Sequence, residues 1–108
     1  MRIYEVRISK AALYDMQELR AFLKGLMSEE GAIRYANTMR DEIKSLSVYA
    51  DCVSRTNSKT LLLIHPNARR LVSHNRRWIY VYHIEENVVI VDRIIPAKMN
   101  KGYTTKSE

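Results

Sequence analysis

Residues 65–95 read HPNARRLVSHNRRWIYVYHIEENVVIVDRII, and this stretch decides the fold. Its β-branched and aromatic residues predict strands over about residues 68–74, 77–84 and 88–95. Asn75 separates the first two strands, and the Glu-Glu-Asn step at 85–87 separates the last two. The apolar run at 60–65 predicts one more short strand, which ends at a Pro66–Asn67 turn. The stretch therefore predicts an antiparallel meander, with four arginines clustered around its first turn.

A helical half is expected before these strands. Residues 2–8 alternate polar and apolar side chains, which predicts a first strand. Ser9 can cap a helix over about residues 10–27, and Ser28 can cap a second helix that ends near Tyr49. The apolar stripes of the two helices are Leu13, Met16, Leu19, Phe22 or Leu23, and Leu26, and then Ile33, Ala36, Met39 or Arg40, Ile43 and Leu46. Residues 50–59 are expected to form a loop. The order of all these elements predicts a two-layer α+β fold, β-α-α-β-β-β-β, with an antiparallel sheet on a helical hairpin.

The length and charge of the chain limit its class. Its 108 residues suit one domain over 1–108, of which residues 97–108 are expected to be a flexible tail. The net charge of +6 points to an anionic partner, either nucleic acid or an acidic protein segment, although solubility alone is the plainer explanation. Cys52 is the only cysteine, which excludes an internal disulfide and favours a cytoplasmic protein. No apolar run approaches the roughly 20 residues that cross a bilayer, so no membrane partner is expected.

The alternation of side chains along the predicted strands defines two faces of the sheet. Trp78, Tyr80, Tyr82 and Ile84 are expected to pack on the helices, which leaves Ile79, Val81 and His83 on the open face. Cationic side chains there suit phosphates or carboxylates, because arginine binds both in bidentate geometry. The alternative is a solvated face whose charges protect the sheet edge. The predicted binding residues are Arg69, Arg70, His74, Arg76, Arg77, Lys98 and Lys101.

Few residues suggest chemistry beyond charge. His83 could act as a general acid or base, although an ordinary half-exposed strand histidine is the commoner case. Tyr103, in the polar tail, could stack on a base. No His, Cys, Asp or Glu spacing indicates a metal site, and the chain has no Gly-rich phosphate loop and no nucleophile elbow. We therefore expect no cofactor.

An ordered set of segments resembles the RelE/ParE toxin superfamily from about residue 3 to about residue 101. The segments are residues 32–36 (AIRYA), 43–46 (IKSL), 69–72 (RRLV), 78–82 (WIYVY) and 89–95 (VIVDRII). The resemblance implies a small bacterial toxin whose sheet places the first strand beside the last. It also implies a toxin–antitoxin hetero-oligomer, in which an acidic, partly disordered antitoxin wraps the helical hairpin and the basic sheet.

The superfamily has two functional branches, and this chain departs from one of them. One branch cleaves ribosome-bound mRNA, and the other poisons DNA gyrase. The nuclease branch carries basic residues where this chain has Ile79 and Val72, and an arginine where it has Lys98. Losing the central arginine removes a main stabiliser of the charge that develops on phosphorus. The gyrase-directed, ParE-like branch is therefore favoured. The alternatives are an mRNA interferase, with Arg70, His83, Lys98 and Tyr103 as its catalytic candidates, and a non-toxic basic nucleic-acid-binding domain.

Overall fold

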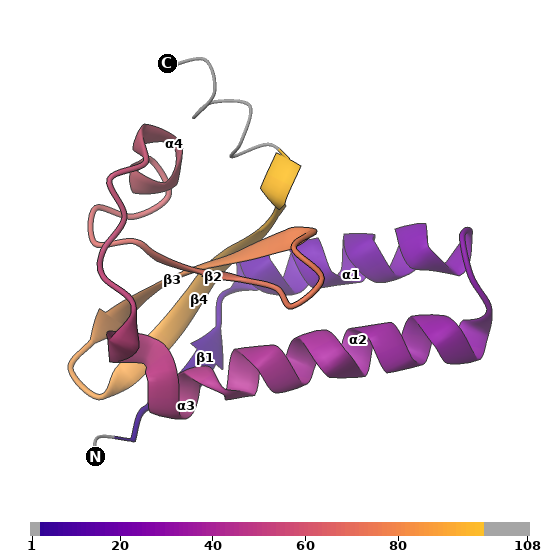
Figure 1. Ribbon diagram of the computed structural model, residues 1–108, viewed down its shortest axis with the longest axis horizontal. Helices are drawn as coiled ribbons and strands as arrows, with labels where there is room; N and C mark the ends of the chain where they lie inside the picture. The colour runs from indigo at the N-terminus through magenta and orange to yellow at the C-terminus, as the bar shows by residue number, and fades with distance from the viewer. Residues whose placement is uncertain (1–2, 99–108) are drawn as a thin grey trace.

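The computed structural model describes residues 3–98 and confirms the α+β class (Figure 1). A four-stranded sheet has the long helices α1 and α2 on one face and the short helix α4 on the other (Figure 1). The elements are β1 (Glu5–Ile8), α1 (Lys10–Lys24), α2 (Glu29–Lys44), α3 (Leu46–Tyr49), a 3-10 turn (Ala50–Cys52), α4 (Lys59–Leu62), β2 (Arg69–Val72), β3 (Trp78–Glu85) and β4 (Val88–Pro96).

Serine caps start both long helices, as predicted. The Ser9 hydroxyl accepts a hydrogen bond from the Ala12 N–H at 3.0 Å, and Ser28 accepts one from Gly31 at 3.0 Å. The first helix ends at Lys24, three residues earlier than expected. The second is interrupted at Ser45, whose hydroxyl donates to the Glu42 carbonyl, and such bonding back to the preceding turn disturbs a helix. The chain then continues as α3 to Tyr49, where the second helix was expected to end.

The strands lie in the order β1-β4-β3-β2, so the first strand lies beside the last, as the resemblance implied. β3 runs antiparallel to β2 and to β4. β1 runs parallel to β4, with Glu5 opposite Val88, so the sheet is antiparallel except at this edge. The α1–α2 hairpin takes the chain away from β1, and the sheet is then completed by the meander β2-β3-β4.

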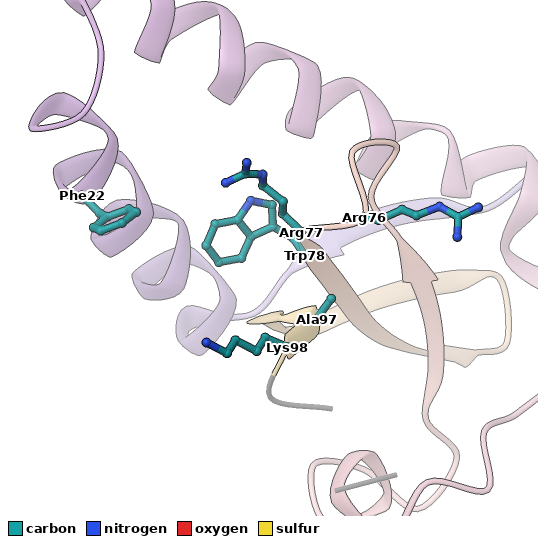
Figure 2. Close-up of a pocket in the computed structure, with 6 residues that line it drawn as sticks. All are labelled: Phe22, Arg76, Arg77, Trp78, Ala97 and Lys98. Atoms are coloured by element: carbon teal, nitrogen blue, oxygen red, sulfur yellow. The ribbon is translucent and has the colours of Figure 1, made fainter. Parts of the chain in front are cut away.

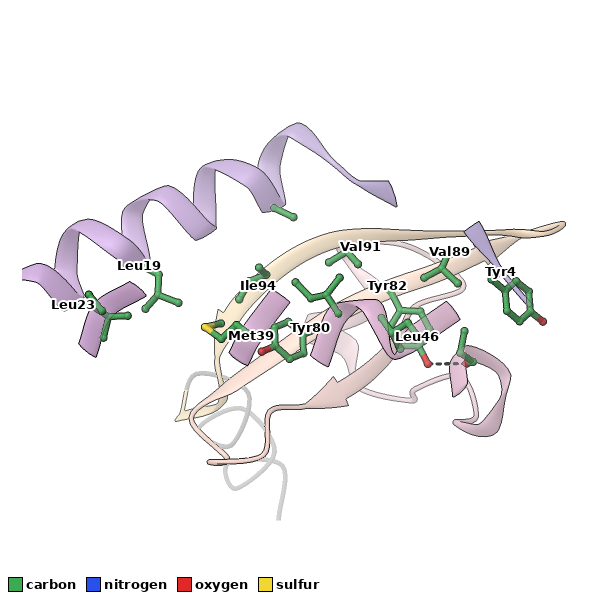
Figure 3. Packing of buried hydrophobic residues seen from close by; sticks show 14 residues of the cluster. Tyr4, Leu19, Leu23, Met39, Leu46, Tyr80, Tyr82, Val89, Val91 and Ile94 are labelled. Carbon is green, nitrogen blue, oxygen red and sulfur yellow. Dashed lines mark hydrogen bonds between the residues drawn. The ribbon is translucent and has the colours of Figure 1, made fainter. Parts of the chain in front are cut away.

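The main core lies between the helices and the sheet, and it includes the expected aromatic face of β3 (Figure 3). Tyr80 and Tyr82 are completely buried, and each hydroxyl has a partner. Tyr82 donates to the Ala50 carbonyl at 2.7 Å, and Tyr80 donates to a Glu42 carboxylate oxygen at 2.6 Å. Several residues expected in the helical stripes are instead exposed: Leu13, Leu26 and Ile33.

The other face of the sheet is covered, which corrects the expectation of an open face. Residues 60–65 were predicted as a strand, and that prediction is wrong, because residues 59–62 form α4. Ser58 caps this helix by accepting from the Leu61 N–H, and the leucines that follow, which are not branched at Cβ, favour a helix over a strand. Leu61 is completely buried in a second apolar cluster with Ala68, Ile79, Val81, Ile95 and Ala97.

The buried tyrosines predict a loss of stability in alkali. Burial raises the pKa of Tyr82 to about 12 from its ordinary value of 10. The folded state therefore keeps the phenol proton at a pH where the unfolded chain has lost it, and the free energy of unfolding should fall as the pH rises from about 10 to about 12. Urea denaturation at pH 8, 10 and 12 measures this fall. The Tyr82→Phe variant should show a shallower fall than the wild type, and equal slopes would contradict the assignment.

Candidate functional site

The predicted cationic residues do not form one surface, and the first two lie on opposite sides of β2. Arg69 lies opposite Tyr82 in the strand register and therefore faces the helices, whereas Arg70 lies opposite Val81 on the other face. The Arg69 guanidinium donates to the Val53 carbonyl at 2.6 Å. It holds the loop before α4 in place, so Arg69 is only partly exposed and lies apart from Arg70. Arg70 is exposed.

The turn between β2 and β3 carries the other predicted cations on a rigid frame. The Asn75 side-chain oxygen accepts from the Ser73 hydroxyl at 2.6 Å and from the Arg77 N–H at 3.0 Å. The Ser73 hydroxyl in turn accepts from the Trp78 N–H at 3.0 Å. Arg76 has a φ of 63°, a left-handed conformation that turns require and that few non-glycine residues adopt. These bonds set the direction in which Arg76 and Arg77 leave the sheet.

Helix α2 holds this turn and the Trp78 ring from the side. The Tyr35 hydroxyl accepts from the Trp78 indole N–H at 2.8 Å and from the Asn75 side-chain amide at 2.7 Å. Glu42, two helical turns further along, accepts from the backbone N–H of His74 at 2.5 Å. His74 itself is exposed in the turn. The indole therefore has a fixed orientation, with its ring edge tied to α2.

Beside the turn lies a pocket of about 440 Å³, which we call the basic aromatic pocket. The Ala97 N–H donates to the Arg77 carbonyl at 2.9 Å, which brings the end of β4 against the turn. In Figure 2, Arg77, Trp78 and Lys98 extend toward the side of α1 that carries Phe22, whereas Arg76 extends the other way. The lining residues are Phe22, Arg76, Arg77, Trp78, Ala97 and Lys98.

The basic aromatic pocket combines three expected binding residues with one aromatic residue that was an alternative for the core stripe. Arg76, Arg77 and Lys98 are exposed and form no ion pair with any of residues 3–98. Phe22 was an alternative to Leu23 for the core stripe, and Leu23 takes that place, which leaves the Phe22 ring 61% exposed. Adjacent helical residues point about 100° apart, so only one of the two could face the core. Unpaired cations beside aromatic rings suit a ligand that is both acidic and apolar.

His83 lies in a different part of the molecule and is buried. It is 4% exposed, which corrects the expectation of a half-exposed histidine on an open face. Its Nδ1 lies 2.6 Å from an Asp92 carboxylate oxygen, and its Nε2 lies 3.0 Å from a Glu85 carboxylate oxygen. The His65 ring stacks on it, with centroids 3.6 Å apart and planes within 4°. Two carboxylates beside the imidazole repel a phosphate, so this environment opposes a role in RNA cleavage.

Two of the nuclease candidates, Lys98 and His83, lie toward opposite ends of β3, whereas Arg70 lies opposite Val81, two residues from His83. Lys98 lies beyond the β4 residue that pairs with Trp78, and His83 lies five residues further along β3. At about 3.3 Å per residue, this places the two roughly 16 Å apart along the strand. Ile79, where the nuclease branch has an arginine, is 2% exposed in the second cluster. Lys101 and Tyr103 lie outside the described residues.

Comparison with known proteins supports the architecture. No protein-family model matches the sequence, and no curated protein matches it. A chain in the solved structure titled "Chromosomal ParDE TA system from P. aeruginosa" is similar, with a TM-score of 0.74 and 15% sequence identity. The match covers 87% of this chain and 96% of that chain, so it shows a shared fold. None of the helices within residues 3–98 combines the length and apolarity needed to span a bilayer.

Proposed function

We propose that this chain is the toxin of a bacterial type II toxin–antitoxin pair, of the ParE-like, gyrase-directed kind, and that a cognate antitoxin neutralises it. The observation that carries the proposal is the shared fold with a chain of a ParDE TA system, which covers 96% of that chain. The resemblance of the sequence segments points to the same superfamily. Residues 3–98 thus adopt this fold, and the side chains exposed on it are particular to this chain.

The helical hairpin offers a surface for the antitoxin. Five large apolar side chains of α1, α2 and their connection are between 47% and 65% exposed: Leu13, Tyr14, Phe22, Leu26 and Ile33. Exposed apolar residues grouped on one supersecondary unit mark a contact surface for another chain. The net charge of +6 favours an acidic partner, and a partly disordered acidic segment can wrap such a surface as it folds. The complex is then a toxin–antitoxin hetero-oligomer.

The pattern around β3 favours action by binding over RNA cleavage. An mRNA interferase must stabilise charge on the phosphorus and move protons at two oxygens. In this chain the central arginine position is the buried Ile79, and His83 is engaged by two carboxylates. Three cations without an ion pair, Arg76, Arg77 and Lys98, instead line the basic aromatic pocket, which we assign to the target, DNA gyrase.

Expression of the chain in a bacterial host, with and without the protein encoded by the neighbouring reading frame, tests the toxin assignment. We expect growth arrest when the chain is expressed alone and recovery when a short acidic partner is present. Unimpaired growth on expression alone would contradict every toxin function and leave the nucleic-acid-binding domain. Ribosome-dependent mRNA cleavage that disappears in Arg70→Ala would instead support the interferase alternative.

A supercoiling assay with purified gyrase tests the pocket. The Arg77→Glu/Lys98→Glu variant should raise the half-inhibitory concentration at least about tenfold, since a loss of 1.4 kcal/mol in binding is already tenfold in affinity. The matched control is Lys10→Glu/Lys59→Glu, which makes the same charge change at exposed positions outside the pocket. Equal losses in the two variants would mean that overall charge, and not the pocket, determines inhibition.

A further inference from the structure

Three side chains that could ligate a metal converge where the α4 segment meets the sheet. His65 follows α4, while His83 and Glu85 lie near the end of β3. One potential ligand atom from each lies within 4.8 Å of the other two. No spacing in the sequence indicates this group, because 18 positions separate the two histidines and only the folding of α4 onto the sheet brings them together.

The Asp92 carboxylate orients the His83 ring so that its Nε2 atom can act as a ligand. The carboxylate accepts from Nδ1 at 2.6 Å, which directs the other ring nitrogen, Nε2, toward Glu85. A carboxylate that orients a histidine in this way is the usual outer partner of a metal-bound imidazole. The His83 side chain is only 5% exposed, so its position is set by packing, whereas the Glu85 side chain is 61% exposed and gives access from solvent.

We propose that His65, His83 and Glu85 bind one divalent ion of the zinc class, and that Asp92 is a positioning residue for His83. Two imidazoles and one carboxylate form a donor set that zinc accepts, with a water completing the tetrahedron. The ion connects the segment after α4 to β3. The role of the ion is therefore to hold the α4 segment against the second apolar cluster. This role is independent of the proposed toxin function.

Binding requires two polar contacts to be exchanged. It also requires the His65 ring to turn out of its stack with His83, because parallel rings 3.6 Å apart do not both direct an in-plane lone pair at one ion. The ion takes the place of the contact between His83 Nε2 and a Glu85 carboxylate oxygen, which lie 3.0 Å apart. His65 Nδ1 accepts from the Asn67 N–H at 3.0 Å. That bond is lost if Nδ1 ligates the ion, and it is also lost if Nε2 does, because the ring proton then moves to Nδ1. The amide of Asn67 therefore reports on binding.

Titration of the full chain with Zn²⁺ by calorimetry, and with Co²⁺ by visible absorption, tests the proposal. We expect one ion per chain, a tetrahedral Co²⁺ spectrum, a shift of the Asn67 amide resonance in NMR, and a higher Tm with Zn²⁺ present. Glu85→Gln should weaken binding at least about tenfold, because even loss of an outer partner costs 10- to 100-fold. The matched control Glu86→Gln changes the neighbouring exposed acid and should bind as the wild type does.

Two further variants separate a ligand role from a structural one. His65→Phe keeps a ring to stack on His83 and removes the ligand, so it should lose the Co²⁺ spectrum while its circular dichroism stays native. Asp92→Asn should retain the ion with about 10- to 100-fold lower affinity and an altered spectrum. The proposal is overturned if the chain shows no saturable Zn²⁺ uptake, or if His65→Phe and Glu85→Gln bind as tightly as the wild type. It is equally overturned if uptake depends on the exposed thiol of Cys52, which Cys52→Ser removes.

Discussion

Leu61→Ala should lower the free energy of unfolding by about 3 kcal/mol, within the 2 to 5 kcal/mol typical of buried leucines. The Leu61 side chain is completely buried in the second apolar cluster, between α4 and the face of the sheet that carries Ile79 and Val81. Truncation removes its apolar contacts and leaves a cavity under a helix of only four residues. Urea denaturation of the variant and the wild type measures the difference.

Leu63→Ala is the matched control, because it deletes the same atoms two residues later. Leu63 is 88% exposed, so its truncation should change the free energy of unfolding by no more than about 0.5 kcal/mol. In a strand, residues 61 and 63 would share one face and respond alike. Similar losses in the two variants would therefore favour the strand that the sequence predicted over the helix.

Asp15→Ala should destabilise the protein by about 2 to 3 kcal/mol, since hydrogen bonds to charged groups contribute about 1.5–3 kcal/mol. The Asp15 carboxylate lies in α1 and is only 12% exposed. It accepts two bonds from the Arg93 guanidinium, at 2.8 and 3.0 Å, and one from the Ile94 N–H at 2.9 Å. Alanine leaves the partly buried backbone N–H without its acceptor and separates α1 from β4. Thermal and urea denaturation both measure the loss.

Two variants serve as references for Asp15. Asp15→Asn keeps one carbonyl oxygen as an acceptor and should cost clearly less than alanine. Glu18→Ala removes an exposed acid from the same helix and should have little effect. If Glu18→Ala destabilised the protein as much as Asp15→Ala, helix charge, and not the bonds to Arg93 and Ile94, would explain the loss.

The candidate site shows which residues could be predicted. Arg76, Arg77 and Lys98 were expected to bind a partner, and the structure places them in one pocket, because all three flank strand ends that pair with each other. Arg69 was expected with them, but its guanidinium lies on the opposite face of β2 and donates a hydrogen bond to the Val53 carbonyl. Only the register of β2 against β3 distinguishes Arg69 from its neighbour Arg70.

The sequence by itself determined where the two long helices begin and which face of β3 packs on the helices. Serine caps, helical stripes and the alternation of Trp78, Tyr80 and Tyr82 are short-range patterns, and each acts through neighbours in the chain. The tertiary structure decided what covers the second face of the sheet. The local sequence of residues 60–65 is compatible with both a strand and a helix. Burial of Leu61 selects the helix.

The tertiary structure also decided the contacts of His65 with His83 and of Asp15 with Arg93. These contacts join residues 18 and 78 positions apart, and no periodicity in the chain encodes them. They form only when the packing of apolar faces has already brought the two segments together. The chain's own pattern thus specifies which surfaces must be buried, and the packed sheet specifies which polar groups then meet.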